Sequence, residues 1–442
     1  MKWNRWYSLH SYIKSSLWIV PVVSFAIEMV LKRVIEWLGS WMVTQGWYDL
    51  KTGFLALGAT EAHSTLERIF TINLSCLVFA FSSLLVAIQV AGGQYTPRII
   101  ATTLLSDNKI RYIIGLFVFT ILWAHRTMNQ LGQAEIVPQF QIFLATLLGG
   151  ASLIAFIVLI DYAAKLLRPV SLVGRIGAQG IAVINKVYPE RTQLAQSPPE
   201  AVIGRKPPDR VVEHHGKSGI VLAVNLPRLM TLAQKEDIVI EFVPQVGDFV
   251  AVNEPLFHLY GQAEGLQEGE MCSLVALGTE RTMEQDSLFA FRIEVDIALK
   301  ALSPAINDPT TAVLAMDQLH RMLRYVGGRS LHSEEIQDSQ GRPRVIFHTP
   351  NWEDFVHIAF REIRHYGTGS MQIARRLRAM LESLLESLPA HRHEELRIEQ
   401  DLLDRMIAKA HSYPEDLALA RIPDSQGLGA GRAKRATLAT DQ

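Results

Sequence analysis

Cysteine is nearly absent from this chain, with only Cys76 and Cys272 among 442 residues. One lies in an apolar segment and the other far downstream, so their spacing fits neither a disulfide framework nor a zinc site. We expect both thiols to be reduced and structural. An excess of basic charge is also absent, because 43 Lys and Arg residues stand against 44 Asp and Glu residues. Without a basic patch, nucleic-acid binding is not expected.

Recognisable catalytic motifs are missing as well. The sequence contains no glycine-rich phosphate loop, no nucleophile elbow and no metal-ligand spacing. It therefore indicates no cofactor and no metal. A function other than catalysis is favoured, and an enzymatic one stays open.

Long apolar runs are present, and nearly all of them lie before Leu167. Each approaches the ~20 residues needed to cross the hydrocarbon of a bilayer. Glu28 interrupts the first run, and because a carboxylate costs roughly 2.5–3.5 kcal/mol at the centre of a span, we expect it to lie near a membrane interface. The runs predict a transmembrane domain over residues 1–168 with four helices, at about 13–31, 69–91, 110–124 and 136–160.

Lysine and arginine set the expected orientation. They precede the first predicted span, separate the second from the third, and follow the fourth, whereas the short segment 129–135 has none. By the positive-inside rule, this distribution predicts a multi-pass protein with both termini in the cytoplasm.

The second predicted span is the richest in polar residues. Intramembrane amides and hydroxyls usually face other helices or a water path. Two interpretations follow, namely hydrogen bonding between packed helices or the lining of a pore. The candidate membrane path consists of Asn73, Ser82, Gln89, Gln94 and Arg98.

Residues 169–265 predict a small β module, with a first strand at 180–187 and strand composition at 218–223, 238–243 and 249–260. The stretch VGDFVAVNEPLFHL, Val246 to Leu259, resembles one half of a biotinyl or lipoyl carrier barrel. This resemblance implies a β-barrel-like module. Asn225-Leu226-Pro227-Arg228 stands at the expected hairpin tip, where a carrier would have a lysine, so a bound prosthetic group is not expected.

The remainder predicts a helical domain over 266–424, followed by a disordered tail at 425–442 that is rich in glycine, alanine and basic residues. At its start, the stretch RTMEQDSLFAFRIEVDIALKALSPAINDPTTAV interleaves charged and apolar residues. An amphipathic helix is expected to end before Ser303-Pro304, because the residue preceding a proline is pushed out of the α region. Asp308 is placed to cap the next helix, with Pro309 at its first position.

The polar residues of this stretch form a candidate hub or ligand site. Asp286 lies on the apolar side of its helix and needs a partner, for which Arg281 and Arg292 are the candidates. The residues can make a hydrogen-bonded structural hub or a ligand or ion site, and both interpretations stay open. The set consists of Arg281, Glu284, Gln285, Asp286, Arg292, Asp296, Ser303, Asn307 and Asp308.

Several motifs together resemble a known family. They are GGQYTPRII, IGLFVFTILW, KSGIVLAVNL, VGDFVAVNEPLF and, above all, RTMEQDSLFAFRIEVDIALKALSPAINDPTTAV. They are similar to the bacterial predicted membrane proteins grouped as domain of unknown function 2254 (DUF2254). The resemblance covers nearly the whole chain and implies a bacterial inner-membrane protein with a transmembrane and a cytoplasmic part.

The expected fold class is therefore an α+β membrane protein with a four-helix transmembrane domain, a small β-barrel-like module and a helical C-terminal domain. The favoured function is a homo-oligomeric ion channel or transporter for small ions, with a cytoplasmic assembly or gating domain. The alternatives are a membrane-anchored scaffold for a partner protein, or a ligand sensor or enzyme that uses the residues between Arg281 and Asp308. The lipid bilayer is an expected partner in every case.

Overall fold

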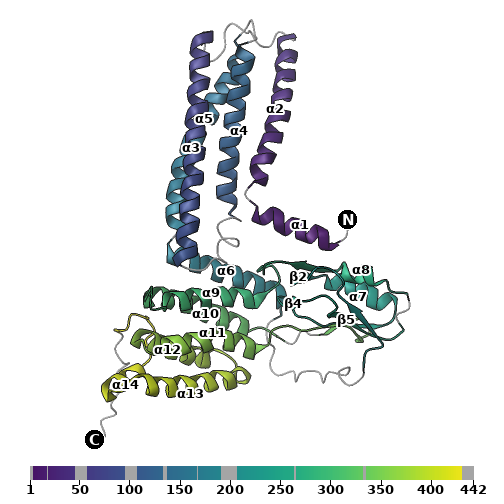
Figure 1. Cartoon of the computed structure of the whole chain (residues 1–442), viewed down its shortest axis with the longest axis vertical. Helices are drawn as coiled ribbons and strands as arrows, with labels where there is room; N and C mark the ends of the chain where they lie inside the picture. The colour runs from purple at the N-terminus through teal and green to yellow at the C-terminus, as the bar shows by residue number, and fades with distance from the viewer. Residues whose placement is uncertain are drawn as a thin grey trace. The chain divides into compact units, whose positions relative to one another are not determined.

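The computed structural model describes residues 3–16, 18–44, 57–94, 107–132, 137–166, 168–190, 207–262, 265–331 and 335–430. Over these residues the chain is a mixed α+β protein in which helices predominate (Figure 1). Its contacts divide it into two compact units, which we call the helical bundle and the α+β unit. The bundle comprises Tyr12–Gly93 and Pro97–Arg168, and the α+β unit comprises Met1–Ser11, Gln94–Thr96 and Pro169–Gln442.

Long helices make up the described part of the bundle (Figure 1). They are α2 (Ile19–Thr44), α3 (Ala59–Gln94), α4 (Asn108–Leu131) and α5 (Gln139–Leu166). Helix α4 packs against both α2 and α5. The approach of α2 is close at Gly115, where an added Cβ would lie 2.7 Å from the Ser24 Oγ. A glycine is therefore needed at this helix crossing.

Two helices of the described bundle are long and apolar enough to cross a membrane, namely α3 over Ala59–Gly93 and α5 over Gln139–Lys165. The predicted first span at 13–31 has the wrong limits, because α1 (Trp3–Ser15) covers its start and α2 begins at Ile19 and continues to Thr44. The charged residues of α2 and α4 interrupt their apolar runs. Among the four predicted spans, apolar length therefore supports the second and the fourth.

The β strands of the described α+β unit form two open sheets. The larger has the order β1-β5-β3-β8-β7 and the smaller the order β4-β2-β6. Only β3 and β8 are parallel among these pairs. The strands are β1 (Arg210–Glu213), β2 (Gly219–Val224), β3 (Val239–Phe242), β4 (Phe249–Val250), β5 (Pro255–Tyr260), β6 (Val275–Gly278), β7 (Glu335–Gln337) and β8 (Pro343–Phe347).

The described strands do not close into the barrel-like module that the sequence predicts. The expected strand at 249–260 is broken by a turn at Asn253, whose φ of 66° is left-handed. As a result β4 pairs with β2 in one sheet, whereas β5 pairs with β1 and β3 in the other. Strands β6, β7 and β8 also come from beyond residue 265, where the sequence placed the end of this module.

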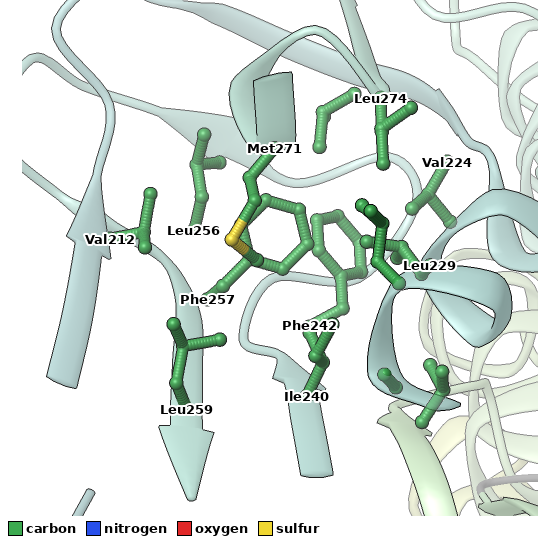
Figure 2. Packing of buried hydrophobic residues seen from close by; sticks show 14 of the residues in the cluster. Val212, Val224, Leu229, Ile240, Phe242, Leu256, Phe257, Leu259, Met271 and Leu274 are labelled. Carbon is green, nitrogen blue, oxygen red and sulfur yellow. The ribbon is translucent and has the colours of Figure 1, made fainter. Parts of the chain in front are cut away.

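A hydrophobic core lies between these strands and two short helices, α7 (Leu226–Lys235) and α8 (Glu268–Cys272). Figure 2 shows Phe242 of β3 and Phe257 of β5 beside Met271 of α8. The ring centroids of Phe242 and Phe257 are 5.5 Å apart. Helix α7 occupies the place where a hairpin tip was expected, because the Asn225 side chain accepts a hydrogen bond from the Arg228 N–H and caps it.

The helical part of the α+β unit packs around α9. Helices α6, α10 and α11 contact α9, while α12, α13 and α14 extend the layer. The helices are α6 (Pro169–Val187), α9 (Ser287–Ala301), α10 (Pro309–Gly327), α11 (Trp352–Gly367), α12 (Met371–Ser387), α13 (His393–Ala410) and α14 (Pro414–Ala420), with a 3-10 turn at Ala390–Arg392.

The strand predicted at 180–187 is wrong, since these residues belong to α6. Leu172, Ile176 and Ile184 recur at helical spacing and are buried. Gly180 meets Met322 and Ala290, where a Cβ would lie 2.5 Å from the Met322 sulfur. The glycines of α6 allow this helix to approach α9 and α10 closely.

The disorder predicted from residue 425 is wrong for residues 425–430. Gln372 Nε2 donates to the Gly427 carbonyl at 2.6 Å, and Arg375 Nη1 donates to the Gly429 carbonyl at 2.7 Å. These contacts hold Ser425–Ala430 against α12. Residues 431–442 lie outside the described part of the chain.

Candidate functional site

Asp286 caps α9 and lies at the centre of a buried polar group. Its Oδ1 accepts a hydrogen bond from the Phe289 N–H at 3.0 Å, and its side chain is 4% exposed. Arg281 Nε lies 3.5 Å from Asp286 Oδ2 and also donates, with Nη2, to the Gly247 carbonyl at 2.9 and 2.7 Å. The predicted partnership of Asp286 with Arg281 is therefore present, and that with Arg292 is not, because Arg292 bonds elsewhere.

Gln285 and Glu284 connect the polar group around Asp286 to other elements of the fold. The Gln285 Oε1 accepts a hydrogen bond from the Val224 N–H at the end of β2, at 3.2 Å. Burial raises the pKa of Tyr7 of α1, and the nearby Glu284 carboxylate adds to this rise. We call Arg281, Glu284, Gln285, Asp286 and Gly247 the cap cluster. Its bonds run to backbone groups and to neighbouring elements, which supports the structural interpretation of these residues.

Burial has the largest effect on the pKa of Asp286. It raises the pKa of this carboxyl from 3.8 to about 6, and Asp248 adds to the rise. The Arg281 guanidinium and the Phe289 N–H act in the opposite direction but are outweighed. At neutral pH the cap cluster therefore holds an ionised carboxylate that is desolvated.

Asp286→Asn is expected to gain stability relative to the parent protein as pH rises from 4 to 7. The raised folded-state pKa means that the folded parent binds more protons than the unfolded one between about 4 and 6, so its stability falls across this window and is constant above it. Asparagine caps a helix as well as aspartate. The gain is at most about 3 kcal/mol, from a rise of 3.8 to about 6 at about 1.36 kcal/mol per unit. Thermal midpoints of the detergent-solubilised proteins check this, and a difference that is constant with pH would contradict it.

Arg292 and Asp296 lie elsewhere, on the side of α9 that faces α11. Arg292 Nε donates to Asp296 Oδ1 at 2.7 Å, and its guanidinium also pairs with Glu362 of α11. These bonds raise the pKa of Arg292. The pair acts as a link between two helices, which is one of the interpretations that the sequence allows.

Ser303, Asn307 and Asp308 form the turn between α9 and α10. The Asp308 Oδ1 accepts a hydrogen bond from the Thr311 N–H at 3.0 Å and caps α10, which confirms the cap predicted from the sequence. The Ser303 Oγ donates to the Lys300 carbonyl at 2.7 Å, and Asn307 has a left-handed φ of 49°. Since α9 has 15 residues, this turn lies about 22 Å along the helix from the cap cluster. The nine predicted residues thus occupy three separate places.

Sequence reasoning missed Glu294, which is fully buried in the middle of α9. Neither of its carboxyl oxygens has a hydrogen-bond partner, and burial raises the pKa of this carboxyl well above its usual range. Gly177 of α6 and Arg321 of α10 approach it and oppose this rise. A signal was present, because Glu294 stands in line with the small residues Ala290, Ala298 and Ala301, a spacing typical of a tightly packed helix face.

The candidate path on α3 divides between two faces. Asn73 is buried, and its Nδ2 donates to the Ile69 carbonyl at 2.9 Å. Ser82 and Gln89 are exposed, and the Ser82 Oγ bonds to the Val78 carbonyl of its own helix. Gln94 is the last residue of α3, and Arg98 lies outside the described residues. These positions therefore do not line one surface within a single chain.

A different set of polar residues lies inside the bundle. Glu28 of α2 is fully buried rather than at the end of its helix, and its Oε2 lies 3.5 Å from Arg126 Nη1 of α4. Lys32, one turn further along α2, is also buried, and Ser24, one turn earlier, faces Gly115. We call Ser24, Glu28, Lys32 and Arg126 the polar seam. It brings charges of both signs between α2 and α4.

The described chain thus combines two helices that are long and apolar enough to cross a membrane with a large α+β unit, an arrangement that fits a membrane protein. The family model described as "Predicted membrane protein (DUF2254)" matches residues 14–383, so the chain belongs to this family. An uncharacterised protein of Mycobacterium bovis and another of Mycobacterium tuberculosis are each 23% identical over 397 residues, covering 87% of this chain and 74% of theirs. No solved structure matches the chain.

Proposed function

We propose that the bundle crosses a bacterial inner membrane four times, with α2 and α4 as spans beside α3 and α5, and with both termini in the cytoplasm. The support comes from the faces of α2. Glu28 and Lys32 are buried and Ser24 is half-buried, whereas Val22, Ile27 and Val30 are among its exposed residues. A helix in water would place charges outside and apolar groups inside, and the reverse arrangement suits a lipid surrounding.

We further propose that the protein is an ion channel or transporter whose path follows the polar seam. The observation that carries this proposal is the Glu28–Arg126 pair, because charged residues inside membrane helices are costly, face the bundle interior and mark ion and substrate pathways. A carboxylate paired with a guanidinium can exchange this partner for a passing cation. The pair thus offers a binding point for a small ion within the apolar bundle.

The exposed polar residues of α3 support a homo-oligomer. Ser75, Ser82 and Gln89 recur every seven residues on an exposed face that is otherwise apolar. Seven-residue spacing keeps side chains on one side of a helix, and hydroxyl and amide groups stabilise contacts between membrane helices. A second copy of the chain would cover these groups better than lipid does.

A ligand sensor or enzyme at the Arg281–Asp308 residues has less support, since these residues occupy three places and bond mainly within the protein. We assign the α+β unit to assembly or gating. Its helix α6 follows α5 after only two residues, so a shift of α6 would be transmitted directly to a candidate span.

Ion flux into proteoliposomes tests this function. We expect flux through the parent protein and a reduction of at least about tenfold in Glu28→Gln, which keeps the side-chain size but removes the charge. Asp161→Asn is the matched control, because Asp161 pairs with Lys165 on the exposed surface of α5 and should leave flux unchanged. The proposal would be contradicted if the parent protein conducted none of several cations and anions, or if the Glu28→Gln protein were fully active.

A further inference from the structure

Helix α1 carries an apolar stripe that no other described element covers. Trp6, Leu9 and Ile13 are 52%, 46% and 37% exposed, and their spacing of three and four residues aligns them along one side of the helix. Trp18, just before α2, is 53% exposed as well. Large apolar side chains aligned in this way mark an interaction surface.

A different side of α1 is fixed to the α+β unit. Trp3 and Tyr7 pack against Leu222 and Ala276 of the smaller sheet. The Asn4 N–H donates to the Ser273 carbonyl at 3.1 Å, and Glu284 of the cap cluster lies near Tyr7, whose pKa its carboxylate helps to raise. Because these contacts set the rotation of the helix, the Trp6–Leu9–Ile13 stripe is held away from the sheet.

We propose that this stripe lies in the interfacial layer of the lipid bilayer, so that α1 attaches the cap cluster to the membrane surface. Helices that lie in this layer are amphipathic, present tryptophan and leucine to the acyl boundary, and carry basic residues that attract anionic lipids. Helix α1 has this composition, since its sequence contains Arg5 and Lys14 and no acidic residue.

The position of α1 in the chain favours lipid over a protein partner. Only three residues separate the end of α1 at Ser15 from the start of α2 at Ile19. If α2 crosses the membrane, as we propose above, its first turn lies at the bilayer surface, and α1 has no length of chain with which to leave it. Tryptophan is also the residue type that collects at this depth, as Trp6 and Trp18 would.

Nitroxide labels on the full-length protein in lipid nanodiscs test the inference. Single cysteines replace Leu9 or, as the water-exposed reference, Tyr413, which is 72% exposed, in a background with Cys76→Ser and Cys272→Ser. We expect the label at position 9 to collide readily with dissolved oxygen and at least tenfold less often with a water-soluble nickel chelate than the label at position 413.

Two results would overturn the inference. Equal nickel collision at the two positions would place the stripe in water. Low collision with both oxygen and nickel would place it against protein, such as a second copy of the chain. The readout does not depend on transport, so a failed flux experiment combined with a lipid-embedded label would refute the proposed function and leave this inference standing.

Discussion

Gly247→Ala is expected to destabilise the α+β unit by about 3 kcal/mol or more, the largest stability effect of any single methyl group that we predict. Gly247 has a φ of +100°, a conformation that costs an alanine roughly 1–3 kcal/mol. The added Cβ would also lie 2.5 Å from both Asp286 Oδ2 and Arg281 Nη2. Overpacking of this kind costs a further ~1–3 kcal/mol. The collision would displace both Asp286, which caps α9, and Arg281, which donates to the Gly247 carbonyl.

The chain offers a matched control for this substitution. Gly341, in the turn between β7 and β8, has a φ of +76°, but nothing lies within 4 Å of an added Cβ. Gly341→Ala therefore reports backbone strain alone, and Gly247→Ala reports strain plus the collision with the cap cluster. Thermal unfolding of both variants in detergent gives the comparison. Equal losses would show that Arg281 and Asp286 move aside freely and that the cap cluster is not rigid.

Local signals predicted the helix boundaries best. Asp308 followed by Pro309 indicates a helix start through side-chain chemistry that acts within three residues, and the cap is present as expected. The cap by Asp286 depends on equally local geometry. The apolar position of this side chain predicts its burial, and of the two candidate partners, Arg281 and Arg292, the structure shows Arg281.

Non-local pairing explains most of the differences in the β region. The left-handed Asn253 sends consecutive residues into different sheets, and β8 reaches β3 from about a hundred residues downstream. Neither the turn at Asn253 nor the pairing of β8 with β3 can be predicted from residue types that favour strands. The glycines of α6 were also ambiguous, because the same residues that interrupt helices in isolation permit close packing once Met322 and Ala290 are beside them.

The candidate membrane path could have been assigned better from spacing alone. Asn73 and Ser82 are nine residues apart, which corresponds to about half a turn of rotation, so they face opposite sides of a helix. Glu28 was different. Its burial against Arg126 depends on how α2 packs on α4, and only the assembled bundle shows which partner offsets its charge.

The polar seam leads to the second large effect, a pattern of chemical accessibility along α2. If ions pass beside Ser24, Glu28 and Lys32, water must reach these positions, although they are turned away from lipid. A cysteine there can ionise and react with a charged thiol reagent, since the thiolate is the nucleophile and needs a polar surrounding. Cysteines at Val23, Ile27 and Val30 are exposed on the bundle but would face hydrocarbon.

Modification of these cysteines by a membrane-impermeant thiol reagent, in proteoliposomes of protein lacking Cys76 and Cys272, is the most direct test that α2 and α4 form the path. We predict that positions 24, 28 and 32 react at least about tenfold faster than positions 23, 27 and 30, and that the reaction at 24 abolishes flux. Equal protection of both sets would show a dry, structural ion pair between α2 and α4 and contradict the proposed path.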